Sequence, residues 1–481
     1  MTQIYAPNVH LFTFHLAEKN NPEHLWNYYN QTIKTAFHLS LHLEPRPSPL
    51  DIKAYLTPNE ASGVFLLFNG KLSAKSPVTD ITGIACPVLI YDSYALALNL
   101  RIPEKDEQNQ PTKPVNLAVF KEFNPQQVLR PEKVNSNLGQ TLLLTAWLLP
   151  PEQKQREQWQ KIAHNILKEF LHDEYVPPLY QASQLFGSPI FEYGSPKHPN
   201  SQGKIEHYLV WLFLDSTADE NLGYFYQQLI DLWLYRQKIT TAYQQSRADF
   251  AKVKAQYQEI KNIFSEIPQH LNVNEQSARL STSDLTYLKT QLKKLPKLDL
   301  EYMESLSSLK NWHSTLSINH HNYKEKITNI QDKATNHDLS FLSSFGTKNA
   351  ATLKTQIEDD LSYFDQGSNW ADKGINTIRG LVEIDQAEAN QDLQDQIQAV
   401  GVGIAAGAIV ASTSGLITQP WYLPNGQKIQ LPCTLPHPFL MALVGSIICS
   451  LGAWWWTKRE IQKRRSLPKE SPNPPKATDQ P

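Results

Sequence analysis

Alternation of hydrophobic and polar residues marks the first 215 residues of the chain. In FHLSLHLE (37–44) every second residue is apolar, which predicts a half-buried strand at 38–44. Further apolar runs predict strands at 8–16, 63–70, 86–100, 115–123, 140–149 and 206–214. The stretches 22–37 and 151–171 begin with proline and predict helices. Strands outnumber helices, so we expect residues 1–215 to form an α+β cytoplasmic domain.

Two short motifs in this domain predict breaks between elements. FNGK (68–71) has the Asn-Gly pair of a hairpin turn, because both residues accept positive φ. GSPIFEYGSP (187–196) is rich in turn residues and is interpreted as a surface loop, with a ligand-capping loop as the alternative.

A different periodicity begins near residue 216. Apolar residues recur at 3-4-3-4 spacing through Phe250, Val253, Tyr257, Ile260 and Phe264, which indicates a coiled coil or a long antiparallel hairpin. SEIPQHLNVNEQSARLSTSD (265–284) interrupts the pattern, and further helices are predicted from about 282 and from about 347. Residues 216–398 are therefore expected to form a stalk of long helices.

Two uncharged runs follow the stalk. Residues 399–417 and 439–456 each lack charge and approach the length of about 20 residues that a membrane-spanning helix needs. The 21-residue loop between them, 418–438, is too short for a domain. These runs predict a two-helix transmembrane hairpin, followed by a basic and then disordered cytoplasmic tail at 457–481.

The flanking residues predict how the hairpin is oriented. Lys458 and Arg459 begin a basic cluster after the second run, whereas the loop holds only Lys428, so the positive-inside rule places both termini in the cytoplasm and the loop outside. Trp454, Trp455 and Trp456 stand where an aromatic belt meets the headgroups, and with Lys458 and Arg459 they are the expected interface anchors. The expected location is the inner or plasma membrane.

Small residues recur at every fourth position of the first run. Gly403, Gly407, Ala411 and Gly415 form a ridge that predicts close helix packing, either between copies or on the second run. Gly445, Cys449 and Gly452 are the expected small face of the second run. The hydroxyl residues 412–414 and Thr418 have two readings of equal weight. They bond back to carbonyls of their own helix, or Ser414 and Thr418 line a pore.

Composition narrows the function classes. The net charge of −2 favours no nucleic-acid partner, and three cysteines without CxxC spacing support neither a disulfide framework nor a zinc site. The sequence lacks GxxxxGK[ST], HExxH and GxSxG, so we expect no enzyme. His38 and His42 are predicted to point outward from a strand, and a metal site there is not favoured.

The order of these segments resembles the CorA family of divalent-cation transporters. The most similar stretch is INTIRGLVEIDQAEANQDLQDQIQAVGVGIAAGAIVAS (375–412). In that family this helix lines the pore of a homopentamer, so the resemblance implies a pore face with Gly403, Gly407, Ala411, Ser414 and Thr418. The family signature Gly-Met-Asn is replaced by Gly415-Leu416-Ile417, which favours a divergent CorA-like channel or effector over a magnesium importer.

Acidic residues are concentrated just before the first run. Ten Asp and Glu residues stand between 355 and 398 against two basic residues, and a solvated helix face is the simplest interpretation. The alternative is cation attraction or Mg²⁺ sensing by stalk carboxylates, as the resemblance implies. The candidates for sensing are Glu383, Asp385, Glu388, Asp392 and Asp395.

The sequence thus predicts a homo-oligomeric CorA-like cation channel or transporter, gated through its cytoplasmic domain. Two alternatives stay open. One is a membrane-anchored signalling or scaffold protein whose hairpin is only an anchor. The other is a membrane effector in stress or defence, opened by a small-molecule or protein regulator.

Overall fold

The fold divides into two compact units. The computed structural model describes residues 2–17, 22–37, 64–66, 70–75, 80–106, 108–134, 136–172, 175–270, 280–364, 367–414, 425 and 438–466. Unit 1 comprises Met1–Glu259 and Leu298–Asn369, and unit 2 comprises Ile260–Lys297 and Trp370–Pro481. The sheet therefore belongs to one unit with the adjoining parts of the helices that follow it.

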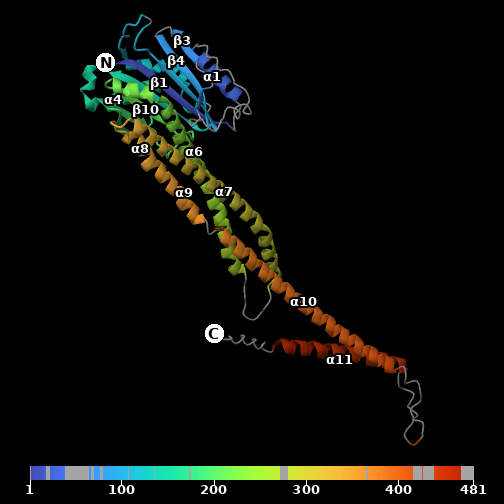
Figure 1. The fold of residues 1–481 in the computed structure, drawn as a ribbon. Coiled ribbons are helices and arrows are strands. Elements are labelled where there is room, and N and C mark those ends of the chain that lie inside the picture. The colour runs from blue at the N-terminus through green and yellow to red at the C-terminus, as the bar shows by residue number, and fades with distance from the viewer. Residues whose placement is uncertain are drawn as a thin grey trace, which may run out of the picture. The chain divides into compact units, whose positions relative to one another are not determined.

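Unit 1 is built on one mixed sheet (Figure 1). The strand order is β2-β4-β5-β1-β7-β10-β9-β8, with β3 paired to β4 and β6 to β1. All pairs are antiparallel except β7 with β10. The strands are β1 Gln3–Leu16, β2 Val64–Leu66, β3 Gly70–Lys75, β4 Asp80–Ile90, β5 Ser93–Arg101, β6 Val115–Asn116, β7 Gly139–Leu148, β8 Leu179–Leu185, β9 Ser188–Tyr193 and β10 Tyr208–Phe213.

Several predicted strands are confirmed and others are not. The runs at 8–16, 86–100, 140–149 and 206–214 correspond to β1, the β4–β5 hairpin, β7 and β10. The run at 115–123 is wrong as a strand, because after β6 it turns into the 3₁₀ helix Leu117–Lys121, whose start is capped by Asn116. The strand predicted at 38–44, with His38 and His42, lies outside the described residues.

Two turn predictions are corrected. β2 and β3 both run antiparallel to β4 in nearly the same register, with Leu66 opposite Val88 and Gly70 opposite Ala85, so they do not form the hairpin predicted at FNGK; Phe68 and Asn69 themselves lie outside the described residues. GSPIFEYGSP is not a surface loop, because its centre is the fully buried strand β9. Gly187 and Gly194 flank the strand and Pro189 lies within it, and six consecutive buried residues outweigh that local turn chemistry.

Helices cover both faces of the sheet. α1 (Pro22–Phe37) and α4 (Arg156–Phe170) share one hydrophobic core with alternate residues of the strands, among them Leu11 and Leu144. The predicted helix at 151–171 is divided into the single turn α3 (Pro150–Gln153) and α4. On the opposite face Tyr226, at the start of α6, contacts the rings of His10 and Phe12.

Long helices follow the sheet, as predicted. The helices after β10, of which α6, α7 and α10 are the longest described, are α5 Ser216–Tyr224, α6 Tyr226–His270, α7 Thr282–Lys333, α8 Ser340–Ser344, the π-helix Phe345–Ala350, α9 Ala351–Phe364, α10 Gly367–Ser414 and α11 Pro438–Ser466. Pro268 was expected to interrupt the first of them, but α6 continues through it to His270.

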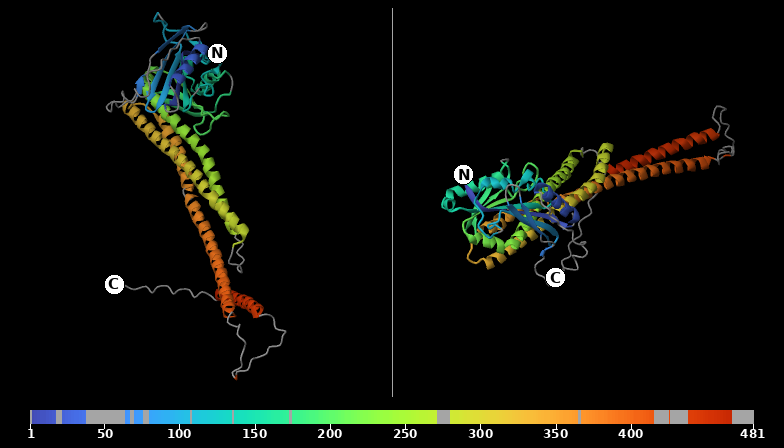
Figure 2. Two further views of the ribbon diagram at one scale, coloured as in Figure 1. Left: turned by 90° about the vertical axis from the view of Figure 1, so that its right-hand side faces the viewer. Right: turned by 90° about the horizontal axis from the view of Figure 1, so that it is seen from above.

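The apolar stripe of α6 packs as the seam of a helical bundle in unit 1. Phe250 and Tyr257 contact the ring of Phe364 on α9 at centroid distances of 5.4 and 5.8 Å. On another side of α6, Asp249 accepts a hydrogen bond from Ser308 of α7. The helices α6, α7 and α9 therefore lie side by side, as Figure 2 also shows.

Candidate functional site

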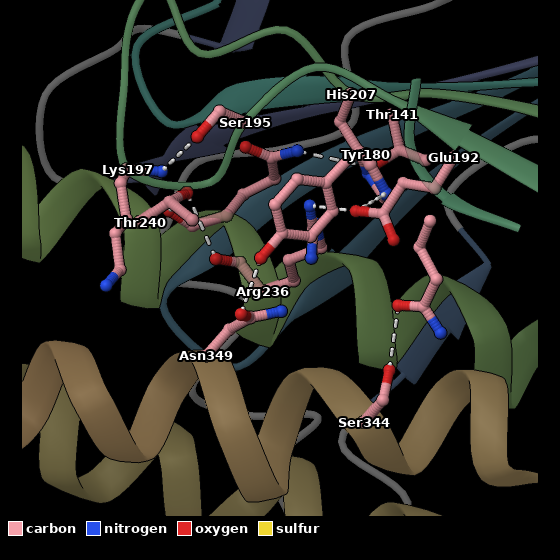
Figure 3. Close-up of polar contacts among 12 residues, drawn as sticks. Thr141, Tyr180, Glu192, Ser195, Lys197, His207, Arg236, Thr240, Ser344 and Asn349 are labelled. Atoms are coloured by element: carbon pink, nitrogen blue, oxygen red, sulfur yellow. Dashed lines mark hydrogen bonds and ion pairs between the residues drawn. The ribbon is translucent and has the colours of Figure 1, made fainter. Parts of the chain in front are cut away.

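A buried ionic cluster joins the sheet to α6 in unit 1. Glu192 of β9 accepts a hydrogen bond from Nη2 of Arg236 on α6 over 2.6 Å, and Nε2 of His207 lies 3.6 Å from the same carboxylate oxygen (Figure 3). His207 Nδ1 is 2.8 Å from the Thr141 hydroxyl of β7. The three ionisable residues are between 2 and 4 % exposed. Charge buried to this degree is retained only when it is paired.

The local backbone explains how β9 brings Glu192 to this place. The β8–β9 hairpin closes through the two-residue loop Phe186–Gly187, with φ of 48° and 81°. Positive φ at both residues matches the right-handed twist of the paired strands. At the other end of β9, Gly194 has φ of 93°, and a Cβ there would lie 2.2 Å from the Glu206 carbonyl oxygen. Only glycine permits the chain to pass so closely.

Phe186 anchors the hairpin tip against the helices. It is 1 % exposed, stacks on Phe225 between α5 and α6 at 5.7 Å, and meets His337 between α7 and α8 at 5.3 Å. An aromatic residue at positive φ is strained, and such strain persists only where the surroundings enforce it. The tip of the hairpin is therefore fixed between two helix junctions.

Burial dominates the electrostatics of the cluster. It raises the pKa of Glu192, and the adjacent Arg236 cation opposes that rise. Burial, reinforced by Arg236, holds the pKa of His207 well below its usual value. His207 is consequently neutral at physiological pH, and the carboxylate of Glu192 is the anion that balances Arg236.

The same arginine reaches the π-helix that precedes α9. Its guanidinium lies 4.3 Å from the centre of the Phe345 ring. His320 of α7 is 2.7 Å from the Gly346 carbonyl oxygen, and the Tyr180 hydroxyl of β8 donates to Asn349 over 2.6 Å (Figure 3). π-helices are rare and often occur at functional positions. The segment is thus tied to the sheet, to α6 and to α7.

Sequence reasoning missed this cluster. Its signal is present as charged residues inside apolar runs, Glu192 in SPIFEY and Arg236 in LIDLWLYRQKI. Their pairing depends on tertiary structure, since they are 44 residues apart. Because Arg236 of α6 contacts both β9 and the π-helix, a shift of one of these elements can displace the others. Within the described ranges, no group of three or more His, Cys, Asp or Glu side chains could hold a metal ion.

In unit 2, α10 and α11 pack through the first part of the predicted glycine ridge. Ser446 donates a hydrogen bond to the Gly407 carbonyl over 2.7 Å. A Cβ on Gly407 would lie 1.9 Å from Ser450 Oγ, and one on Gly403 would lie 3.1 Å from Trp454 Cβ. These two glycines therefore serve close packing against α11 of the same chain.

The expected small face of α11, Gly445, Cys449 and Gly452, is not the side that packs on α10. The contact side is formed by Ser446, Ser450 and Trp454, spaced four apart. Gly445 reaches only Val410 at 4.0 Å, Cys449 is exposed, and no described atom lies within 4 Å of a Cβ on Gly452. Serine is small enough for close approach and also bonds to a backbone carbonyl, which favours it at this contact.

The remaining ridge and hydroxyl residues are described only in part. Ser412 donates to the Ala408 carbonyl over 2.7 Å, which confirms the back-bonding interpretation at that position. Ala411 and Ser414 lie in α10, but the structure does not describe their side chains, and Gly415 and Thr418 lie outside the described residues.

The predicted sensing acids all lie on α10. Glu383 is exposed, Asp385, Asp392 and Asp395 are half-buried, and the side chain of Glu388 is not described. Asp392 and Asp395 line a cavity of about 450 Å³ together with Trp454 and Lys458 of α11. The structure therefore brings two of these acids to the predicted interface anchors Trp454 and Lys458.

The predicted interface anchors combine aromatic and basic groups on α11. Lys458 Nζ lies 5.2 Å from the Trp454 ring centre, and the Arg459 guanidinium lies 5.3 Å from that of Trp455. Trp455 and Trp456 are 57 and 63 % exposed. Amphipathic rings and cations displayed in this way suit a headgroup region.

One described helical stretch meets the length and hydropathy that a membrane crossing requires. It is Ser340–Val410, whose most apolar window has a mean hydropathy of 1.2 and is 17 % buried. The described part of α11 does not meet that measure. Comparison with known proteins found no matching family model, no matching curated protein and no matching solved structure.

Proposed function

We propose that the protein is a homo-oligomeric, CorA-like membrane channel or transporter for cations, gated through its α+β domain. In this proposal α10 and α11 form a two-span hairpin in the inner or plasma membrane, with both termini in the cytoplasm. A pentamer is the assembly that the family resemblance implies, and Mg²⁺ is the first ion to test. Neither nucleic acid nor an enzymatic reaction has a part in it.

The observation that carries the proposal is the continuity of α10. This helix runs for 48 residues without a break, about 72 Å at 1.5 Å per residue, from Gly367 through the acidic stretch to Ser414. Its apolar end packs closely on α11 through Gly403 and Gly407. A rigid helix of this kind can carry a displacement from the soluble part of the chain to a membrane segment.

The exposed side of α10 supports assembly into an oligomer. Ile404 and Ile409 are 66 and 65 % exposed, and α11 leaves that side of the helix uncovered. Lipid or neighbouring copies can cover such residues. A pore further requires that α10 helices of several chains meet, with the acids that precede Ala399 near the inner mouth.

A first experiment measures mass and conduction. The full-length protein is purified in detergent, its mass is determined, and cation flux is recorded after reconstitution into liposomes. A conducting oligomer, pentameric in the first instance, supports the proposal. A monomer or dimer that passes no cation contradicts it. Mg²⁺ sensing by the stalk acids is tested in the same liposomes, because flux unaffected by Mg²⁺ would remove that part.

The second candidate function is a membrane-anchored signalling or scaffold protein, or a ligand-activated effector. The buried ionic cluster around Arg236 is consistent with it, because a ligand-responsive protein that does not conduct can also use a fixed contact between sheet and helices. Gly407→Leu discriminates between the two, with Gly401→Leu as the matched control at an open position. A channel loses flux or assembly with the first variant only, whereas an anchor retains membrane localisation and partner binding with both.

A further inference from the structure

Two adjoining cavities lie in unit 1 where the segment before β7 meets α6. Their volumes are about 140 and 220 Å³, and Asn137, Leu138, Thr241 and Gln245 line both. Pockets for small molecules occupy roughly 300–1,000 Å³, so the two cavities together are at the lower end of that range. The ionic cluster around Arg236 does not contribute to either lining.

The smaller cavity is lined mainly by carboxamide and hydroxyl groups. Gln237, Gln244 and Gln245 of α6 face Ser136, Asn137 and Gln140. Lys204 is the one charged residue in the lining that the structure describes, and it is exposed. Such a wall offers both donors and acceptors at neutral charge.

Two buried glutamines give this cavity a fixed floor. Gln140 is 1 % exposed and donates to the Leu129 carbonyl over 2.9 Å, while its Oε1 is buried with no hydrogen-bond partner among the described residues. Gln237, also 1 % exposed, donates to the Gln140 carbonyl over 2.7 Å. These two hydrogen bonds hold the glutamines in fixed positions beside the cavity.

Gly139 leaves space for the side chain of Gln237 beside the cavity. Its φ is +114°, and a Cβ there would lie 2.5 Å from Gln237 Oε1. Glycine therefore permits the amide oxygen of Gln237 to stand against the backbone beside the cavity. A residue with a side chain would push that amide away.

The larger cavity adds an aromatic wall and a charged rim. Trp312 of α7 lines it, and its indole N–H donates to Asp249 over 2.8 Å, which fixes the ring. Asn319 lines the same cavity and donates to the Thr315 carbonyl over 2.7 Å. Lys238 and Asp92 form an ion pair at its edge.

We propose that these cavities form one binding site for a nucleobase-containing ligand, a nucleoside or its monophosphate. Carboxamides pair with the donor and acceptor edges of bases, and an aromatic ring offers a stacking surface. The described linings hold three charged residues, and two of them, Lys238 and Asp92, form an ion pair, so a neutral ring system fits the site better than a metal ion or a polyanion. Lys204 at the mouth suits one phosphate.

A ligand bound at this site contacts both the sheet side and the helices of unit 1. Its walls come from the segment before β7, from α6 and from α7, and Gln237 is the neighbour of Arg236 in the sequence. A ligand held there favours one packing of sheet against helices. Regulation of conduction by this ligand rests on the proposed channel function, whereas binding itself does not.

The test is titration calorimetry on the full-length protein in detergent. The probes are adenosine, guanosine, cytidine, uridine and their 5′-monophosphates, with glucose as a polar molecule without a base. The variant Gln244→Ala/Gln245→Ala removes two amides that form no hydrogen bond within the described part of the chain, and Gln227→Ala is the control, an exposed glutamine of α6 that lines neither cavity. Loss of two hydrogen bonds weakens binding by about tenfold or more.

The site is supported if at least one nucleoside binds, the double variant weakens it by that factor, and Gln227→Ala leaves it unchanged. Lys204→Ala should then weaken the monophosphate and spare the nucleoside. The proposal is overturned if no nucleoside or monophosphate binds, if the double variant binds as the wild type does, or if glucose binds equally well. Flux measured with and without the bound nucleoside tests regulation separately, so failure of conduction leaves the binding result intact.

Discussion

Removal of the Glu192 charge is the most direct test of whether the buried ionic cluster of Glu192, His207 and Arg236 stabilises unit 1. Glu192→Gln keeps the shape of the side chain but leaves the Arg236 guanidinium, which is 2 % exposed, without its counter-ion. His207 cannot replace it, because an imidazole carries either no charge or a positive one, and burial together with Arg236 holds the pKa of His207 well below its usual value. Breaking one side of a buried pair typically costs about 3–5 kcal/mol.

The assay is guanidinium unfolding of the full-length protein, followed by tryptophan fluorescence. Trp211 and Trp233 are buried on the same side of the sheet and report on this region. Arg236→Met in the Glu192→Gln background removes both charges and should restore most of the loss, since an apolar replacement of a buried pair is often neutral.

A half-exposed ion pair provides the matched control. Lys354 and Glu358 are 3.3 Å apart on α9, with side chains 36 and 44 % exposed. Lys354→Met should therefore cost less than about 1 kcal/mol. If Glu192→Gln lowers the free energy of unfolding by no more than Lys354→Met does, the charges of the ionic cluster do not stabilise the contact between sheet and helices, and the prediction is wrong.

Three further predictions concern the membrane pair, pH and topology. Gly407→Leu should destabilise the α10–α11 contact by about 1–3 kcal/mol, measured as loss of the native species in size-exclusion chromatography on heating, because its Cβ would overlap Ser450 Oγ, whereas Gly401→Leu should have no effect. Burial, with a smaller effect of Arg101, lowers the pKa of His10 to about 3, and burial lowers that of His15 to about 4. Below pH 6.5 the unfolded chain therefore binds protons that the folded chain does not, so stability falls as pH falls, by about 2 kcal/mol per histidine at pH 5, and His15→Gln should flatten this dependence in unfolding titrations. With Cys86 and Cys449 replaced by serine, Cys433 in the predicted outer loop should react with a membrane-impermeant maleimide on intact cells, and protection until lysis would reverse the assigned orientation.

Local pattern determined much of the helical half of this protein. The 3-4 spacing of Phe250, Tyr257 and Phe264 appears in the structure as the packed side of α6, and helix starts near 282 and 22 are found at Thr282 and Pro22. Periodicity of this kind succeeds because an amphipathic helix must bury one stripe, whatever its partner is.

The sheet was predictable in its strands and less so in its connections. FNGK and GSPIFEYGSP carry turn residues, yet β2 and β3 before and after the first run in the same direction and the second contains β9. In β9, pairing with neighbouring strands stabilises an extended backbone more than local turn propensity stabilises a turn.

The sequence by itself determined which segments are apolar, charged or small, and hence the α+β part, the long helices and the glycine spacing that allows close packing. Only the tertiary structure decided what these residues meet. Gly407 lies against Ser450 and Glu192 pairs with Arg236, although no local rule links the members of either pair, and Gln140 lines a cavity. The physical reason is that burial and hydrogen-bond satisfaction are properties of the assembled core, set by side chains that are distant in the chain.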